Sequence, residues 1–73
     1  MTLSPTGAEA LRRLARNTAA DRATHRSAVH AAARSALFAR GLIEWVPGSG
    51  ERHLRLTPLG AIAAVELGTG EAA

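Results

Sequence analysis

The chain lacks cysteine, lysine and tyrosine, and its only large aromatic residues are Phe38 and Trp45. Without cysteine it can form neither a disulfide nor a thiolate metal site. No stretch approaches the roughly 20 apolar residues that a membrane-spanning helix needs. The N-terminal residues lack the basic and apolar segments of a secretory signal. We therefore expect a cytoplasmic protein with no membrane partner.

The length of 73 residues allows one domain, which we assign to residues 1–73 with a flexible tail from residue 68. A chain of this size buries only about 60% of its unfolded surface. Its stability must therefore come from close helix packing or from association with a second copy.

Arginine supplies all nine basic residues, and the formal net charge is +3. Residues 12–40 contain seven of these arginines and one acid, Asp21. This local excess favours an anionic partner, and the guanidinium group suits phosphate and guanine. A GC-rich genome would give the same composition, so both explanations stay open.

Two stretches of the chain contain the same helix-start pattern. Ser4-Pro5 and Thr57-Pro58 each offer an N-cap followed by a proline suited to the first helical position. We predict helices over residues 5–16 and 58–67. The second is apolar on nearly every side, so it should be buried. The simplest cover is a second copy of the chain, through Leu59, Ile62, Ala63, Val65 and Leu67.

Another helix is predicted from Ser27 to Arg40, with Ser27 or Thr24 as its N-cap. Gly41 suits the left-handed residue that ends many helices. Three basic residues spaced four apart would share one outward face of this helix: Arg26, His30 and Arg34.

Residues 17–25 fit two interpretations. They form either a short separate helix capped by Asn17 or Thr18, which we prefer, or a continuation of the first helix. If residues 5–40 formed one long helix, the protein would be an antiparallel helical dimer with a terminal hairpin.

A β-hairpin is predicted from two short strands, residues 42–46 and 52–56, joined by a turn at residues 47–50. Glu44 could pair across the strands with His53 or Arg55. The side chains expected to be buried are Ile43, Trp45, Leu54 and Leu56. The predicted fold class is α+β, mainly α with a β-hairpin.

The sequence contains no group of residues typical of catalysis. Its acids are scattered, and no nucleophile has a base and an orienting group to match. His25 and His30 are five residues apart, so they do not share one helix face, and His53 is isolated. We expect no enzymatic activity, no cofactor and no metal.

The predicted order is helix, helix, helix, strand, wing, strand, helix, and it resembles a winged helix-turn-helix domain. The resemblance is closest to bacterial regulators of the MarR and PadR types. There the recognition helix ends in a Leu-x-x-x-Gly-Leu-[Ile/Val]-x run, as residues 37–44 do here. The returning wing strand leads through Leu-Thr-x-x-Gly into a helix, as residues 56–60 do here. The match covers residues 25–66, and the chain lacks the extra helices that those families use for dimerisation and ligand sensing.

This resemblance implies a homodimeric transcription regulator that binds double-stranded DNA and is associated with the nucleoid. The helix ending at Arg40 would enter the major groove, and the wing would contact the backbone or the minor groove. The implied DNA-binding residues are Arg26, Ser27, His30, Arg34, Arg52, His53 and Arg55. Phosphates could also be neutralised by Arg12, Arg13 and Arg16.

Two other functions stay open. A winged-helix domain can be a protein–protein adaptor that does not bind DNA, because fold does not determine function. An architectural protein would bind DNA without sequence preference.

Overall fold

The helix-start pattern at Ser4 is confirmed in the computed structural model, which describes residues 3–68. Ser4 Oγ accepts a hydrogen bond from the Gly7 N–H at 3.1 Å, and Pro5 opens helix α1, Pro5–Ala19. The helix is longer than predicted. Its inward side, which includes Leu11 and Leu14, is fully buried in the core.

The separate short helix preferred for residues 17–24 is wrong, and the continuation of α1 is right only as far as Ala19. The Asn17 side-chain Nδ2 donates to Thr24 Oγ1 at 2.7 Å, and the Asn17 backbone carbonyl accepts from the Arg22 backbone N–H at 2.7 Å. Asn17 therefore closes a turn instead of starting a helix. The chain passes through a left-handed residue, Asp21, and continues into strand β1, Thr24–His25.

Helix α2, Ala31–Ala39, begins later than the predicted start at Ser27. Its N-cap is His30, whose Nδ1 accepts from the Ala32 N–H at 3.2 Å, so neither Ser27 nor Thr24 caps it. The preceding residues form a short 3₁₀ helix, η1, Arg26–Ala28, followed by Val29 in an extended conformation. Val29 is buried, and this tertiary contact decides the boundary. The predicted C-terminal end is confirmed, because Gly41 has a φ of 71°.

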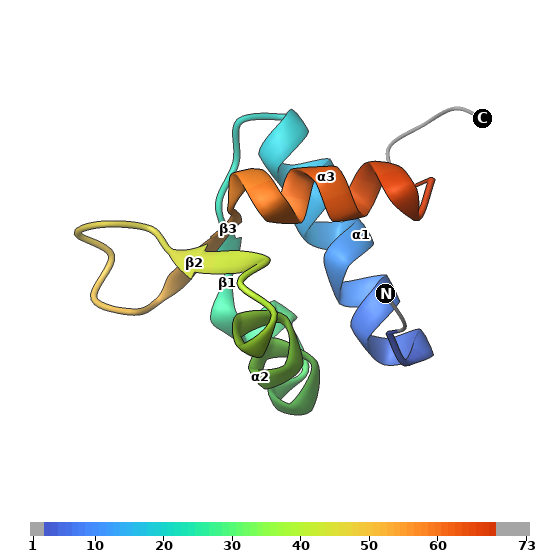
Figure 1. The fold of residues 1–73 in the computed structure, drawn as a ribbon. Coiled ribbons are helices and arrows are strands. Elements are labelled where there is room, and N and C mark those ends of the chain that lie inside the picture. The colour runs from blue at the N-terminus through green and yellow to red at the C-terminus, as the bar shows by residue number, and fades with distance from the viewer. Residues whose placement is uncertain (1–2, 69–73) are drawn as a thin grey trace.

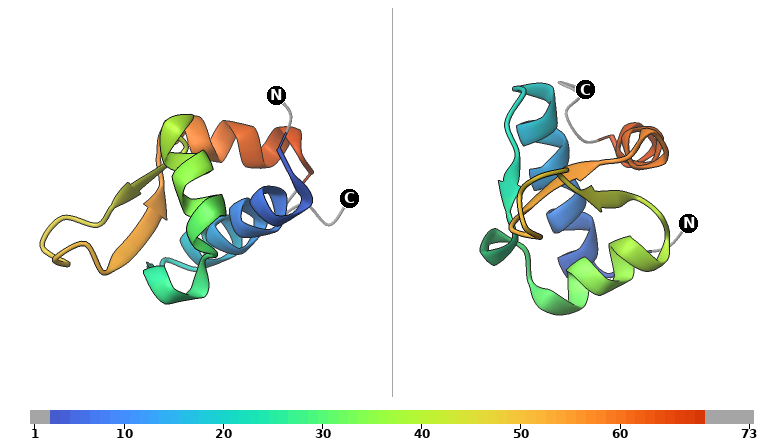
Figure 2. Two further views of the ribbon diagram at one scale, coloured as in Figure 1. Left: turned by 90° about the horizontal axis from the view of Figure 1, so that it is seen from below. Right: turned by 90° about the vertical axis from the view of Figure 1, so that its left-hand side faces the viewer.

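The predicted hairpin is confirmed as strands β2, Ile43–Trp45, and β3, His53–Leu56. Together with β1 they form an antiparallel sheet in the order β1-β3-β2. The two-residue β1 is too short for a periodic pattern and escaped prediction. The loop that joins β2 to β3, residues 46–52, is here called the hairpin loop. It projects away from the three helices (Figures 1 and 2).

Alternation along the hairpin places apolar residues on one face of the sheet. Ile43 and Leu54 are buried, while Trp45 and Leu56 are half-buried against the same core. Trp45 lies beside Phe38 of α2, with ring centroids 5.3 Å apart.

Helix α3, Pro58–Glu66, confirms the last predicted helix but is not buried on every side. Its small residues Gly60, Ala63 and Ala64 pack inward. Leu59, Ile62 and Val65 are 54%, 57% and 61% exposed. The predicted tail lies outside the described residues, apart from Gly68.

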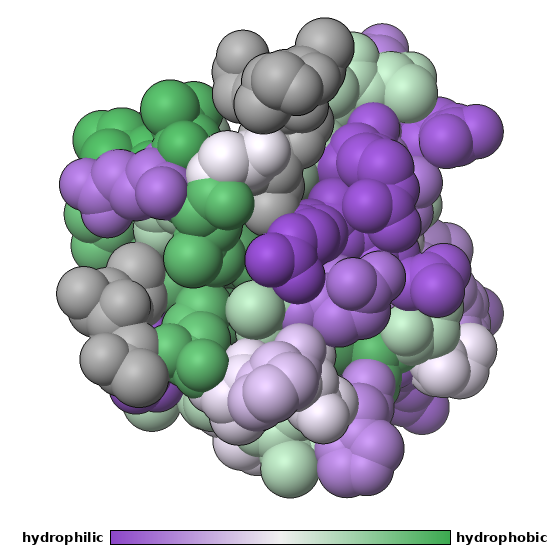
Figure 3. Space-filling view, turned by 90° about the vertical axis from the view of Figure 1, so that its right-hand side faces the viewer, coloured by the Kyte–Doolittle hydropathy of each residue, from purple (hydrophilic) through white to green (hydrophobic). Residues whose placement is uncertain are grey.

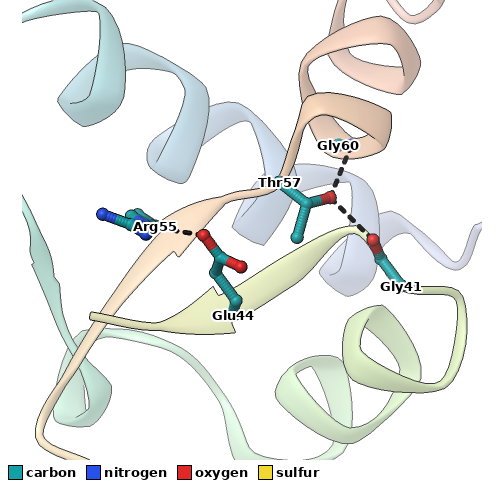
Figure 4. A network of polar contacts seen from close by, with 5 residues as sticks. All are labelled: Gly41, Glu44, Arg55, Thr57 and Gly60. Atoms are coloured by element: carbon teal, nitrogen blue, oxygen red, sulfur yellow. Dashed lines mark hydrogen bonds and ion pairs between the residues drawn. The ribbon is translucent and has the colours of Figure 1, made fainter. Parts of the chain in front are cut away.

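Thr57 joins the start of α3 to the end of α2 (Figure 4). Its Oγ1 donates to the Gly41 carbonyl at 2.6 Å and accepts from the Gly60 N–H at 3.0 Å. Its backbone N–H donates to the Leu42 carbonyl at 3.0 Å. At Gly60 the helix presses so closely on this carbonyl that a Cβ would overlap the Leu42 oxygen.

Replacing Gly60 with alanine should lower the free energy of unfolding by about 1–3 kcal/mol or more, because the helix must move away from the Leu42 carbonyl. Gly7 is the matched control, since it too is the third residue of a helix that begins with proline. A Cβ at Gly7 would meet nothing nearer than 3.4 Å. Gly7→Ala should therefore be neutral or stabilise by about 0.5–1 kcal/mol. Urea unfolding curves give both values, and equal effects would contradict the close packing at Gly60.

Candidate nucleic-acid interface

Arginines from three segments lie together where η1 meets the hairpin loop. The Arg26 backbone N–H donates to the Arg52 carbonyl at 2.9 Å. The Arg26 guanidinium Nη1 donates to the Glu51 carbonyl at 3.3 Å. These bonds hold η1 directly beside the hairpin loop, although 25 residues separate Arg26 from Glu51.

Arg34 connects α2 to the same place. Its Nη1 donates to the Arg26 carbonyl at 3.1 Å and to the Val29 carbonyl at 3.4 Å. Arg26, His30 and Arg34 therefore do not form the predicted stripe on one helix, because Arg26 belongs to η1 and His30 is the N-cap of α2. Folding nevertheless brings Arg26 and Arg34 into contact.

The hairpin loop has a defined shape. Arg52 Nε donates to the Ser49 carbonyl at 3.0 Å, and Ser49 Oγ accepts from the His53 N–H at 3.4 Å. Gly48, Gly50 and Glu51 all have positive φ. The exposed Arg52 is thus presented by a loop that is bonded across its own turn.

Histidines flank this surface. His25 and His53 are opposite each other in β1 and β3, with ring centroids 5.2 Å apart and nearly perpendicular rings. His25 Nδ1 accepts from the Ser27 N–H at 3.1 Å and lies 2.8 Å from Ser27 Oγ. His30 accepts a backbone N–H through Nδ1, so a neutral His30 carries its proton on Nε2. We call the surface formed by the other residues the basic face: His25, Arg26, Ser27, Arg34, Arg52 and His53. His30 instead lines a hollow beside Pro5 and Arg13 of α1.

Arg55 is in a different setting. It lies on β3, where its Nε contacts Glu44 Oε2 at 2.7 Å, which confirms the predicted cross-strand pair (Figure 4). This acid neutralises the charge that Arg55 would offer to a phosphate. On α1, Arg12 and Arg16 flank Glu9 at 3.7 and 3.8 Å, so their charge is also partly balanced.

The exposed side of α2 carries small residues: Ala31, Ala32, Ser35 and Ala39. Sequence reasoning missed this surface because it placed the basic residues there. The Ala-rich run of residues 31–39 was the sequence signal for this surface, but interpreting it requires the start of the helix to be known.

A second exposed surface lies on α3. Leu59, Ile62 and Val65 form a hydrophobic patch beside the hydrophilic side of α1 (Figure 3). A groove of about 310 Å³ adjoins it, lined by Arg40, Leu42, Leu59, Ile62, Ala63 and Glu66. Ala63 and Leu67 were also predicted to lie at the interface, but the structure turns them towards the chain's own core. Ala63 is only 3% exposed, in the chain's own core, and Leu67 is half-buried against it.

Within residues 3–68, no three potential ligand side chains come together to hold a metal ion. Over the same range, no helix is long and apolar enough to cross a membrane. Comparison of the chain with protein-family models, with curated proteins and with solved structures finds no match.

Glu51 occupies a left-handed conformation, with φ 59°, in the hairpin loop, next to Arg52. Glu51→Gly should leave the free energy of unfolding unchanged or raise it by up to about 1 kcal/mol, because glycine adopts this conformation without steric cost. Glu51→Ala is the control, because it removes the same charge and keeps the steric cost. If urea unfolding shows the alanine variant to be the more stable of the two, backbone strain at this position is excluded.

Proposed function

We propose that the chain is a winged-helix DNA-binding protein that acts as a transcription regulator. Helix α2 enters the major groove, and the hairpin loop is the wing, which contacts the backbone or the minor groove. The observation that carries the proposal is the set of hydrogen bonds that Arg26 makes. Its backbone and side chain contact the hairpin loop, and its carbonyl accepts from Arg34 of α2.

This arrangement supports the proposal because a helix and a hairpin must be held at a fixed spacing to contact one duplex. The bonds of Arg26 provide that spacing without disulfides. The arginines around them favour phosphate, to which a guanidinium donates two parallel hydrogen bonds.

The arginines of the basic face have different roles in this proposal. Arg26 and Arg52 are exposed and contact phosphates, which position the protein on the duplex. Arg34 is half-buried and holds η1 against α2, so it is a positioning residue. Arg55 lies outside the basic face and contributes little, since Glu44 balances its charge.

Duplex binding should depend steeply on salt. Between about 50 and 200 mM salt, a protein making roughly 6–10 phosphate contacts loses about 10³–10⁵ in affinity. Arg52→Ala should reduce the slope of log affinity against log salt by about 0.9, the value for one lost phosphate contact. Fluorescence anisotropy with a mixed-sequence duplex measures both.

The control is Arg22→Ala, which makes the same charge change outside the basic face, where Arg22 donates to the Asn17 side chain. It should leave the slope nearly unchanged. Equal slopes for the Arg52 and Arg22 variants would remove the hairpin loop from the interface.

Dimerisation is part of the proposal and uses the outer side of α3. Leu59, Ile62 and Val65 are more than half exposed, and a second copy would cover them. A two-fold dimer would place its half-sites about one helical turn apart on DNA.

Ile62→Asp should convert the dimer to a monomer, because a charge would be buried at its centre. Sedimentation velocity measures the mass, and Glu66→Gln is the control at a neighbouring exposed position. A wild-type chain that sediments as a monomer at high concentration contradicts this part of the proposal.

The exposed side of α3 also favours a second candidate, a winged-helix adaptor that binds another protein. Failure to bind any duplex at low salt would favour the adaptor. Binding of equal strength to all duplexes would instead indicate an architectural DNA-binding protein.

A further inference from the structure

The hydrophobic patch on α3 has an acid at one end. Glu66 is the last residue of the helix and is exposed, and the last turn contains no basic residue. A carboxylate at the C-terminal end of a helix faces the negative end of the helix dipole, which is unfavourable without a cation nearby. Among residues 3–68, Glu66 forms no ion pair. Its charge is therefore left for a cation from outside this part of the chain.

A base lies at the other end of the patch. Arg40 is the C-cap of α2. The next residue, Gly41, accepts from the Thr57 hydroxyl, and a Cβ at Gly41 would lie 3.9 Å from Leu59 Cδ2. The backbone of Arg40 is therefore close to the first turn of α3, whereas Glu66 is about 10 Å further along the helix. Both side chains line the groove that adjoins the patch.

Apolar contact alone does not set the orientation of a second copy on this patch, because it is non-directional. The charges at its two ends do set it. In a two-fold interface each contact between two different residues occurs twice, once in each direction. Two copies of α3 that run antiparallel bring the acidic end of one to the basic end of the other, at both ends. Two parallel copies would instead bring the Glu66 side chains together, and like charges repel.

We infer that two copies of the chain pack α3 against α3 in antiparallel orientation, with Glu66 of each copy paired to Arg40 of the other. The helices cross near Ile62, which lies close to the middle of the stretch from Leu59 to Glu66. The inference rests on the dimer of the proposed function and names the interaction that sets its orientation. The guanidinium donates to the carboxylate, and the pair occurs twice in the dimer.

Charge reversal tests the pairing by sedimentation equilibrium. Glu66→Arg should raise the dissociation constant of the dimer about tenfold, because the two-fold axis repeats each repulsion. An arginine suits the C-terminal end of α3, so weaker association of this variant is not a folding defect. Glu66→Gln keeps a side-chain oxygen that accepts from a guanidinium, so it should stay dimeric.

The matched control is Glu51→Arg. It makes the same change of charge on the hairpin loop, which projects away from α3 (Figure 1). It should leave the dissociation constant nearly unchanged. Equal weakening by Glu51→Arg and Glu66→Arg would assign the effect to net charge and overturn the inference.

A mixture of two variants shows whether the pair joins different copies. Arg40→Glu should also weaken the dimer about tenfold, because it then faces Glu66. An equimolar mixture of Arg40→Glu and Glu66→Arg should return to the wild-type dissociation constant, since a dimer with one copy of each has an acid opposite a base at both contacts. Circular dichroism checks that Arg40→Glu is folded. If it is not, Arg40→Gln replaces it, and the mixture should still associate more tightly than Glu66→Arg alone.

The outcomes separate the inference from the dimer on which it rests. A wild-type dimer that neither charge reversal weakens overturns the antiparallel pairing and leaves the dimer intact. Variants that dissociate and do not recover on mixing show that Arg40 and Glu66 do not meet across the interface, which also overturns the inference. A wild-type chain that is monomeric at high concentration overturns both and leaves the patch to a different protein.

Discussion

The backbone around Thr57 fixes the positions of the elements that meet there. Its N–H bonds to the Leu42 carbonyl, and its hydroxyl bonds to the Gly41 carbonyl and the Gly60 N–H. Leu42 lies between α2 and β2, while Thr57 lies between β3 and α3. One residue thus satisfies backbone groups at the end of one helix and the start of another. Only glycine fits at position 60, because the α3 backbone there lies against the Leu42 carbonyl. The packing of α3 on the sheet follows from that close approach.

Several of the arginines form internal contacts as well as a charged surface. Arg34 and Arg26 donate to backbone carbonyls, and Arg52 donates to a carbonyl of its own loop. These bonds add to the β1–β3 pairing and to the buried Val29 in holding η1, α2 and the hairpin loop together. The same guanidinium groups remain exposed or half-exposed at the edge of the basic face. Charged side chains that bond to the backbone add order to the surface of a domain with a small core.

Much of the fold was predictable because its signals are local. Ser4 and Thr57 are both N-caps, Gly41 has a positive φ, and Glu44 pairs with Arg55. The stretch from Asn17 to Val29 was not predictable in the same way. Thr24 pairs with Leu54 of β3 and Val29 is buried in the core, and both depend on contacts with residues elsewhere in the chain. The error at the start of α2 then carried over to the candidate site, because it assigned three basic residues to one helix face.

The sequence by itself determined the starts of α1 and α3, the end of α2, the alternation along the hairpin and the excess of positive charge. Capping, glycine conformation and the period of two act within a few residues, so they can be recognised without a structure. Only the tertiary structure decided which side of α2 is exposed, that Arg34 bonds back to η1, and that β1 joins the sheet beside β3. These features depend on residues that are distant in the sequence and meet only when the core forms. The orientation of each side chain then follows from that packing and not from its local pattern.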